Sequence, residues 1–309
     1  LLTAEGGTAM DHAVMVARAD EVTGPYRGSP RNPVLTHRDL AAGHPIVGTG
    51  HGDLVETPGG EWWMVLLGMR PHHRDRCALG RETFLVPVTW EDGWPVTGGR
   101  VEPEPPAPAL PPHPWPAVPL CDQFDGPELA PAWNMLRTPR ERWWSLDERP
   151  GHLRLRVRPE SLADVGNPSF VGRRQQHHRF AAFTSLDFEP RDEEWAGQNN
   201  DFHVLLVSTR EGIRLVKREQ GIETVLAEAP AAPGPVRLGF EAHGRWYQAS
   251  YSVSGPDGWT RLGSPVDGDI LTSQVAGGFT GVYIGLYATA NGRSSGNHAD
   301  FDWFEYRPL

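Results

Sequence analysis

The sequence predicts an all-β protein made of antiparallel strands. Three observations support this class. Short segments in which polar and apolar residues alternate recur along the chain, as in HAVMVARA and FHVLLVSTR. Clusters of Gly, Pro, Asn and Asp separate these segments, as tight turns require. No long segment shows the 3.6-residue spacing of an amphipathic helix. The pattern favours a sandwich, a barrel or a propeller.

Length and composition restrict the functions that fit this chain. Its 309 residues suggest two domains. A hydrophobic fraction of 39% with 12 Trp is enough to build packed cores. The net charge of −10 argues against a nucleic-acid partner, which selects a basic face, whereas a neutral sugar makes no such demand. No apolar run reaches the ~20 residues that a membrane span needs, so we expect no membrane partner.

The cysteines indicate the compartment. Cys77 and Cys121 are the only two in the sequence, which is too few for a disulfide framework. We expect two unlinked thiols, a reducing environment and hence a cytoplasmic protein. The sequence opens on LLTAEGGT without a Met or a secretory leader, and a signal segment upstream of Leu1 stays compatible with it.

The first hundred residues contain strands joined by turns. HAVMVARA is followed by the turn signal GPY. Residues 50–68, GHGDLVETPGGEWWMVLLG, predict a hairpin whose two strands flank a Pro-Gly-Gly turn. ETFLVPVTW, residues 82–90, is a further strand that ends at EDGWP. This set of strands does not obviously close on itself.

A proline-rich segment separates the two halves of the chain. Nine of the nineteen residues in 101–119, VEPEPPAPALPPHPWPAVP, are proline. Proline has no backbone donor and a fixed φ, so this segment should run extended outside any sheet. We interpret it as an interdomain linker. A strap packed along the surface of one domain is an alternative that is compatible with this interpretation.

Residues 120–309 again predict only strands. Most of these segments alternate polar and apolar residues, as each sheet of a two-layer sandwich requires. The predicted strands are HLRLRVRP, RFAAFTSLDFEP, FHVLLVSTR, IRLVKRE, VRLGFEAHG, WYQASYSVS, GVYIGLYAT and ADFDWFEY.

The tryptophan pairs Trp62-Trp63 and Trp143-Trp144 lie within the predicted sheets. Neighbouring strand residues face opposite sides, so at most one member of each pair can face a ligand. We expect these tryptophans to belong to the core rather than to sugar-binding platforms.

Several phrases together resemble one family. LLTAEGGT, GPY with NPVLT, GHGDLVETPGGEWW and LGRETFLVPVTWEDGWP occur in the order seen late in the catalytic domain of glycoside hydrolase family 43. They are most similar to its β-xylosidase and α-L-arabinofuranosidase branch. FVGRRQQH and ADFDWFEY resemble the concanavalin A-like β-sandwich fused to those xylosidases. Residues 192–207 depart from the pattern through an inserted polar QNND.

The resemblance implies a fold and an organisation. Residues 1–100 would form about the last two blades of a five-bladed β-propeller, 101–119 a linker, and 120–309 an antiparallel concanavalin A-like sandwich. The family's catalytic base and a second, orienting aspartate lie in blades upstream of this segment. We therefore expect a fragment that is inactive alone. The resemblance implies no cofactor for the chemistry.

Glu5 is the candidate general acid. Glycoside cleavage needs a protonated carboxyl group that donates to the leaving oxygen. The glycines at 6 and 7 remove side chains that would obstruct a sugar and tolerate the turn. The family inverts configuration, so a base should stand ~6.5–9.5 Å from the acid, with water between them. On residues alone, Glu-Gly-Gly is also an ordinary strand-end turn.

Two further residues in this half match positions of the family site. Arg81, in LGRET, matches the active-site arginine, whose guanidinium donates to sugar hydroxyls. Arg81 and Glu82 should face opposite ways on a strand, and a surface ion pair is the alternative. His51 matches a histidine on the propeller axis near the catalytic carboxylates. On its own, a His between glycines is more often a loop residue.

Two predictions concern the sandwich. In the xylosidases resembled here, a sandwich loop places a phenylalanine over the sugar pocket, and Phe279 in GGFTGVYIG matches it. The alternative is a half-buried Phe at a strand start. Asp122 and Asp125, with Asp302, could bring the first and last strands together around a structural calcium. Surface Asp residues in turns are the alternative.

The resemblance leads to one function and leaves two alternatives open. It implies a fragment of an inverting exo-glycosidase that releases terminal xylose or arabinose from xylan or arabinoxylan oligosaccharides, and it is compatible with a homo-oligomer. The first alternative is a non-catalytic carbohydrate-binding β-sandwich protein. An upstream extension containing both aspartates would favour the enzyme. A sandwich that only mediates oligomer contacts would show a large apolar patch.

Overall fold

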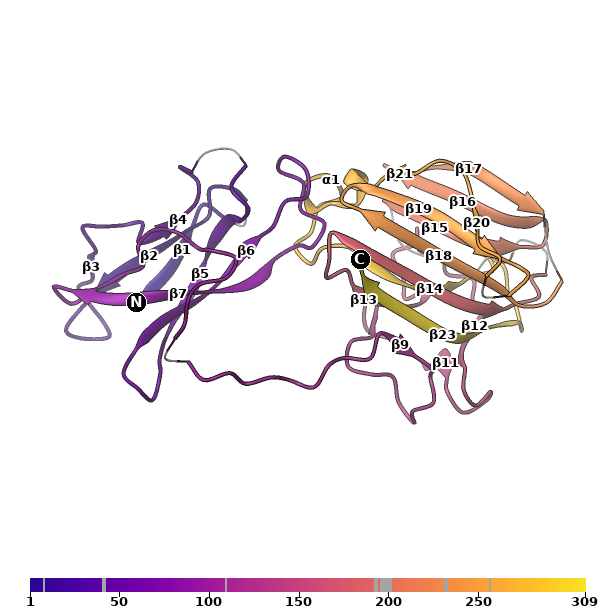
Figure 1. Ribbon diagram of the computed structural model, residues 1–309, viewed down its shortest axis with the longest axis horizontal. Helices are drawn as coiled ribbons and strands as arrows, with labels where there is room; N and C mark the ends of the chain where they lie inside the picture. Colours follow the sequence, from indigo (N-terminus) through magenta and orange to yellow (C-terminus); the bar gives the residue numbers. More distant parts are fainter. Residues whose placement is uncertain are drawn as a thin grey trace. The chain divides into compact units, whose positions relative to one another are not determined.

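The structure is a computed structural model that describes residues 1–7, 9–40, 43–108, 110–191, 194, 202–230, 233–255 and 257–309. The all-β prediction is confirmed (Figure 1). The helical elements among these residues are the 3-10 turn η1 (Gly268–Leu271) and the one-turn helix α1 (Ser273–Ala276). None of the described helices is long and apolar enough to cross a bilayer.

The chain divides into two compact units. The first contains residues 1–116 together with 278–280, and the second contains residues 117–277 and 281–309. The division falls inside the proline-rich segment 101–119, whose described residues form no strand. At its start, Val101 is fully buried, and its backbone N donates to Nε2 of His37 at 2.9 Å. The segment therefore begins as part of the first unit.

The first unit consists of antiparallel sheets, as predicted. One holds β1 (Leu2–Glu5), β2 (Ala13–Arg18), β3 (Arg27–Gly28) and β4 (Leu35–Thr36). The other is a meander of β5 (Val47–Glu56), β6 (Trp62–Met69), β7 (Glu82–Glu91) and β8 (Trp94–Val96). Its β5–β6 pair is the predicted hairpin. Both β1 and β2 contact β5, which brings the two sheets together.

Alternation decides which side chains form the core of this unit. Val14 and Val16 of β2 point to the same side, as do Met64 and Leu66 of β6, and all four are buried. Trp63 is buried as well. Trp62 is only partly buried and packs edge-on against the exposed Trp90.

The second unit is an antiparallel sandwich, as predicted. Its nine-stranded sheet contains β9 (Cys121–Asp122), β11 (Trp144–Ser145), β12 (Leu153–Arg156), β14 (Arg179–Asp187), β18 (Val236–His243), β19 (Trp246–Ser252), β20 (Thr260–Arg261), β21 (Val266–Asp267) and β23 (His298–Pro308). The other sheets are β10 (Asn134–Met135), β13 (Ser169–Arg174) and β22 (Tyr283–Ala288), and β15 (His203–Thr209), β16 (Gly212–Glu219) and β17 (Ile222–Pro230).

The core of the sandwich lies between these sheets. It joins Phe180, Leu238 and Phe304 of the nine-stranded sheet to residues of the other two, such as Leu206 and Leu286. Trp143 is fully buried and Trp144 is partly buried against the core, which agrees with the expectation that these tryptophans belong to the core. The first and last strands, β9 and β23, are neighbours, with Asp122 opposite Phe304.

The structure tests the predicted cysteines but not the predicted insertion. Cys77 and Cys121 are both free thiols, as expected. The inserted QNND, residues 198–201, lies outside the described residues.

Candidate active site

Glu5 is positioned by a turn that only glycine can form. It is the last residue of β1 and pairs with Ala13 of β2. Gly6 and Gly7 follow with φ of +75° and +66°. A Cβ at Gly6 would lie 2.1 Å from the carbonyl oxygen of Asp11. The turn therefore requires glycine, and it leaves the Glu5 side chain half exposed at the strand end.

Arg38 orients the Glu5 carboxyl group. It follows β4, and its Nη1 donates to Oε1 of Glu5 at 3.3 Å. A guanidinium in this place restricts where a half-exposed carboxyl group lies. Sequence reasoning missed Arg38 because 33 residues separate it from Glu5 and the phrase THRDL carries no motif.

His12 is a second residue that the sequence did not single out. Its Nδ1 lies 3.1 Å from the carbonyl oxygen of Glu5, and only 2% of the residue is exposed. A carbonyl only accepts, so Nδ1 carries the proton of a neutral ring and Nε2 keeps its lone pair. Nε2 is buried without a hydrogen-bond partner in the part of the chain that the structure describes.

The environment of His12 keeps its ring neutral. Burial lowers its pKa, the Glu5 carbonyl partly opposes this, and the nearby charges of His51 and Arg81 lower it further. The His12 ring packs against Gly50, the residue before His51. The imidazole of His12 therefore lies between the backbone of the candidate acid and the strand that carries His51.

His51 projects from an irregular part of β5. The β5–β6 register shifts between Val47 and Gly50 and again between Gly50 and Asp53, and His51 has a φ of +53°. Gly50 is buried against the His12 ring, and Gly52 against Met64. The glycines that surround His51 thus let the strand pass these side chains while the imidazole stays exposed.

Arg81 and Glu82 take separate partners. Glu82 accepts from Nε and Nη2 of Arg70 at 2.9 and 2.7 Å. This bidentate pair raises the pKa of Arg70. The guanidinium carbon of Arg81, by contrast, lies 4.9 Å from the centroid of the Phe279 ring. The Arg81 guanidinium thus lies against an aromatic ring.

Phe279 lies in a glycine-rich loop between α1 and β22. Gly277, Gly278 and Gly281 all have positive φ, which allows the sharp path of the loop. Residues 278–280 belong by their contacts to the first unit. The carbonyl oxygen of Phe279 accepts from the backbone N of Arg81 at 3.4 Å, and the residue is 52% exposed. The ring is therefore available to a ligand on one face.

Four of the seven predicted site residues lie in the first unit. The ring of His12 reaches from the carbonyl of Glu5 to Gly50 beside His51, and Arg81 contacts Phe279. A half-exposed carboxyl group, a guanidinium and an open aromatic face can donate a proton, bind hydroxyl groups and stack on a sugar ring.

The other three residues, Asp122, Asp125 and Asp302, lie in the second unit. Oδ1 of Asp122 accepts from the backbone N of Phe124 at 2.9 Å, and Oδ2 accepts from Nε1 of Trp133 at 2.8 Å. Asp302 lies two residues before Phe304, the partner of Asp122 across the β9–β23 pair. Among the described residues, no three His, Cys, Asp or Glu side chains gather as a metal site would require. The calcium site stays a prediction.

Comparison with family profiles assigns both units. Residues 1–95 match the profile of glycosyl hydrolases family 43. Residues 121–307 match the profile of the β-xylosidase C-terminal concanavalin A-like domain.

Individual relatives agree with these profiles. The chain is 39% identical to the non-reducing end α-L-arabinofuranosidase BoGH43B of Bacteroides ovatus, over 100% of this chain and 60% of that protein. It is 36% identical to a xylan 1,3-β-xylosidase of a Vibrio species, over 99% of this chain and 62% of that protein. The crystal structure of a xylan β-1,4-xylosidase from Bacillus halodurans superposes with a TM-score of 0.93 at 34% identity, covering 99% of this chain and 62% of that one. The chain thus spans about 60% of the length of the curated relatives it matches.

Proposed function

Because the chain belongs to glycoside hydrolase family 43, we propose that it is part of an inverting exo-glycosidase that releases terminal xylose or arabinose from xylan-derived oligosaccharides. One observation carries the proposal. The half-exposed Glu5 ends a strand, and its carbonyl is held by His12, whose ring packs against Gly50 beside His51. The relatives named as xylosidases and as an arabinofuranosidase support both sugars.

Glu5 is the proposed proton donor. Its carboxyl group hands a proton to the glycosidic oxygen as the bond to the sugar carbon breaks. Gly6 and Gly7 place no side chain beside it, so a sugar can approach. Arg38 holds the carboxyl group from one side at 3.3 Å.

Arg81, His51 and Phe279 are proposed to bind the terminal sugar. The Arg81 guanidinium donates to neighbouring hydroxyl groups, and the exposed face of Phe279 stacks on the C–H face of the ring. We propose that Phe279 blocks one end of the sugar-binding site, which would suit an enzyme that removes one sugar at a time from the chain end.

The remaining catalytic groups are proposed to lie outside these 309 residues. The family's base and second aspartate belong to earlier blades, and the chain spans about 60% of its curated relatives. Residues 1–309 alone should therefore show no hydrolysis, because no base activates the attacking water.

The first experiment measures purified 1–309 on an aryl β-xyloside and an aryl α-arabinofuranoside. We expect rates at the buffer background for both. Hydrolysis that Glu5→Gln abolishes would show that the chain is catalytically complete and would overturn the proposed inactivity.

The second experiment uses the polypeptide encoded from its natural start codon. Glu5→Gln should lower kcat by about 10²–10⁴-fold on xylobiose. The loss should be smaller on an aryl xyloside whose leaving group needs little protonation. Glu56→Gln, an exposed carboxylate on β5, is the matched control and should leave kcat unchanged. Equal losses on both substrates would rule out a proton-donor role for Glu5.

Two further features of the protein are proposals. The two free thiols support a cytoplasmic location, which fractionation of the source cells would test.

The structural calcium at Asp122 and Asp302 would raise the Tm of the second unit when calcium is added after chelation. An unchanged Tm would contradict the proposed calcium site.

A further inference from the structure

The outer face of the nine-stranded sheet in the second unit carries a groove. It is an open hollow lined by side chains of β14, β18, β19, β20 and β23, together with Trp259. Because the side chains of a strand alternate, the other faces of β14, β18 and β23 supply core residues such as Phe180, Leu238 and Phe304. The groove thus lies on the side of the sheet that faces away from the core. Figure 1 shows these strands side by side.

The hollow follows from the strand register. Across the middle of the sheet, Glu305, Phe183, Gly239, Ser250 and Arg261 stand in one row on five neighbouring strands. The large or charged residues are at the ends of this row and the small ones near its centre. A Cβ at Gly239 would lie 1.9 Å from the Phe183 ring, so the ring lies flat over this glycine. The floor of the groove is therefore aromatic and low.

Trp259 extends this aromatic surface. Its ring centroid lies 4.6 Å from that of Phe183, with the planes tilted by 50°. Trp303 lines the same groove from β23. Phe183 is buried at 9% exposure, whereas Trp259 is only partly buried. A partly exposed indole in a hollow of this kind can stack on the C–H face of a sugar ring.

Charge is uneven along the groove. At one end, Arg307 pairs with Glu305 at 3.4 Å and also lies over the Phe183 ring. Ala181 on β14 pairs with Arg307 of β23 on one side and with Glu241 of β18 on the other. At that end, acidic side chains therefore accompany the positive charge of Arg307.

The other end has guanidinium groups without acidic partners. Arg237 lies in the row that contains Trp303, Ser185 and Ser252. Its Nη1 is buried and makes no hydrogen bond to any described residue. Arg261 has no ion pair within the described part of the chain. A buried donor of this kind costs free energy unless a ligand accepts from it.

We propose that this groove binds an oligosaccharide that carries a uronic acid. A neutral sugar stacks on Trp259, which Phe183 supports from below, and the carboxylate accepts from Arg237 and Arg261. Planar guanidinium groups pair with carboxylates in two parallel hydrogen bonds, which gives both affinity and orientation. The net charge of the chain is −10, so this cationic end attracts an acid through local geometry rather than through the overall field.

Calorimetry on purified 1–309 tests the proposal. The ligands are xylotetraose that carries one glucuronic acid and unsubstituted xylotetraose. We expect saturable binding of the acidic ligand, at least about fivefold tighter than the neutral one and weakened by added NaCl. Failure of the acidic ligand to bind, or equal affinity for both ligands, would overturn it.

Variants assign the binding to the groove. Arg237→Gln and Trp259→Ala should each weaken the acidic ligand about tenfold, which corresponds to the loss of a charge-assisted hydrogen bond or of a stacking face. Arg261→Gln, an exposed position, repeats the charge test should Arg237→Gln fail to fold. Arg140→Gln, an exposed arginine outside the groove, should leave this affinity unchanged. Undiminished binding in folded Arg237→Gln or Arg261→Gln, or a loss in Arg140→Gln, would contradict the assignment.

Discussion

The imidazole of His12 packs directly against Gly50: a Cβ on residue 50 would lie 2.1 Å from Cδ2 of the ring. The same ring holds the carbonyl oxygen of Glu5 through Nδ1. The absence of one methyl group on β5 thus allows the histidine to reach the strand that carries the candidate acid.

Gly50→Ala should therefore push His12 away from Glu5. We expect the first unit to lose about 1–3 kcal/mol of unfolding free energy, as overpacked cores do. Urea denaturation measures this loss. Gly59→Ala is the matched control because its new Cβ would meet only Oγ1 of Thr57 at 3.7 Å. A loss no larger than that of the control would show that the contact is not restrictive.

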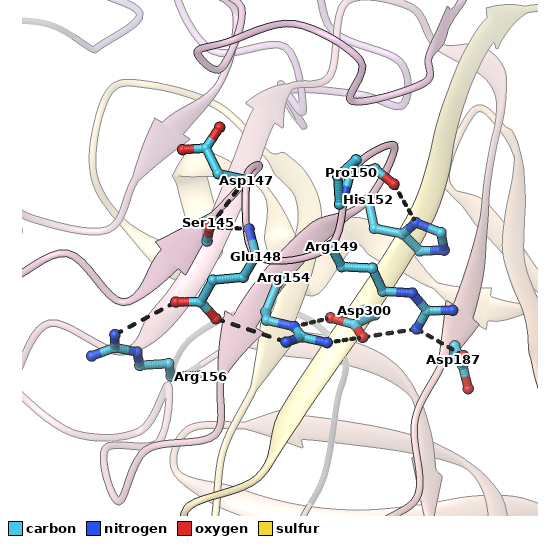
Figure 2. A network of polar contacts seen from close by, with 10 residues as sticks. All are labelled: Ser145, Asp147, Glu148, Arg149, Pro150, His152, Arg154, Arg156, Asp187 and Asp300. Carbon is cyan, nitrogen blue, oxygen red and sulfur yellow. Dashed lines mark hydrogen bonds and ion pairs between the residues drawn. The ribbon is translucent and has the colours of Figure 1, made fainter.

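Asp300 is the centre of an ion-pair network in the sandwich (Figure 2). Its carboxylate accepts two hydrogen bonds from Arg154 at 2.7 and 2.8 Å and one from Arg149 at 2.8 Å. Burial acts to raise the pKa of Asp300, but the two arginines outweigh it and hold the pKa below its ordinary value.

Asp300→Asn should destabilise the second unit by about 2–3 kcal/mol, because it leaves two partly covered guanidinium groups without their shared carboxylate. Asp187→Asn, which removes the more exposed partner of Arg149, should cost less than about 1 kcal/mol. Because the pKa of Asp300 is lower in the folded chain than in the unfolded chain, its contribution to the free energy of unfolding is complete above pH ~4. This contribution is lost as the pH falls further. Equal losses in both variants at neutral pH would contradict the central role of Asp300.

His203 makes the sandwich sensitive to mild acid. It is 2% exposed on β15, both of its ring nitrogens lack hydrogen bonds to described residues, and burial lowers its pKa to about 3, with a smaller effect of Arg218. The unfolded chain binds a proton near pH 6.5 while the folded chain does not. The contribution of neutral His203 to the free energy of unfolding is therefore complete above pH ~6.5 and falls as the pH decreases toward 3.

Unfolding free energies of wild type and His203→Leu should diverge between pH 7 and pH 4. The wild type should lose roughly 3 kcal/mol more than the variant over this range. His243→Leu, at an exposed position on β18, should follow the wild-type curve. Parallel curves for wild type and His203→Leu would show that His203 does not titrate in this way.

Trp143 should contribute more to the stability of the sandwich than the other tryptophans do. It is fully buried, and its Nε1 donates to Oδ1 of Asn167 at 3.0 Å. Trp143→Ala should cost about 3–5 kcal/mol through lost burial and the cavity left behind. Trp115→Ala, at a position 81% exposed in the proline-rich segment, should change the thermal midpoint little. A midpoint shift of similar size in both variants would contradict this assignment.

Much of the architecture could be predicted from the sequence because it depends on local patterns. The β5–β6 hairpin follows from alternating residues on both sides of Pro-Gly-Gly. The positive φ of Gly6 and Gly7 accounts for the turn after Glu5. The order of the family phrases predicted both units, and the profile matches confirm the family.

Tertiary structure alone decided which distant side chains meet. The sequence indicated Glu5, His51, Arg81 and Phe279, but Arg38 and His12 reach Glu5 only because β1, β2 and β4 share a sheet. The groove on the sandwich likewise depends on the register of five strands, which places Gly239 under Phe183. Alternation tells which face a residue takes, but strand pairing over long separations decides its neighbours, and no local pattern encodes that pairing.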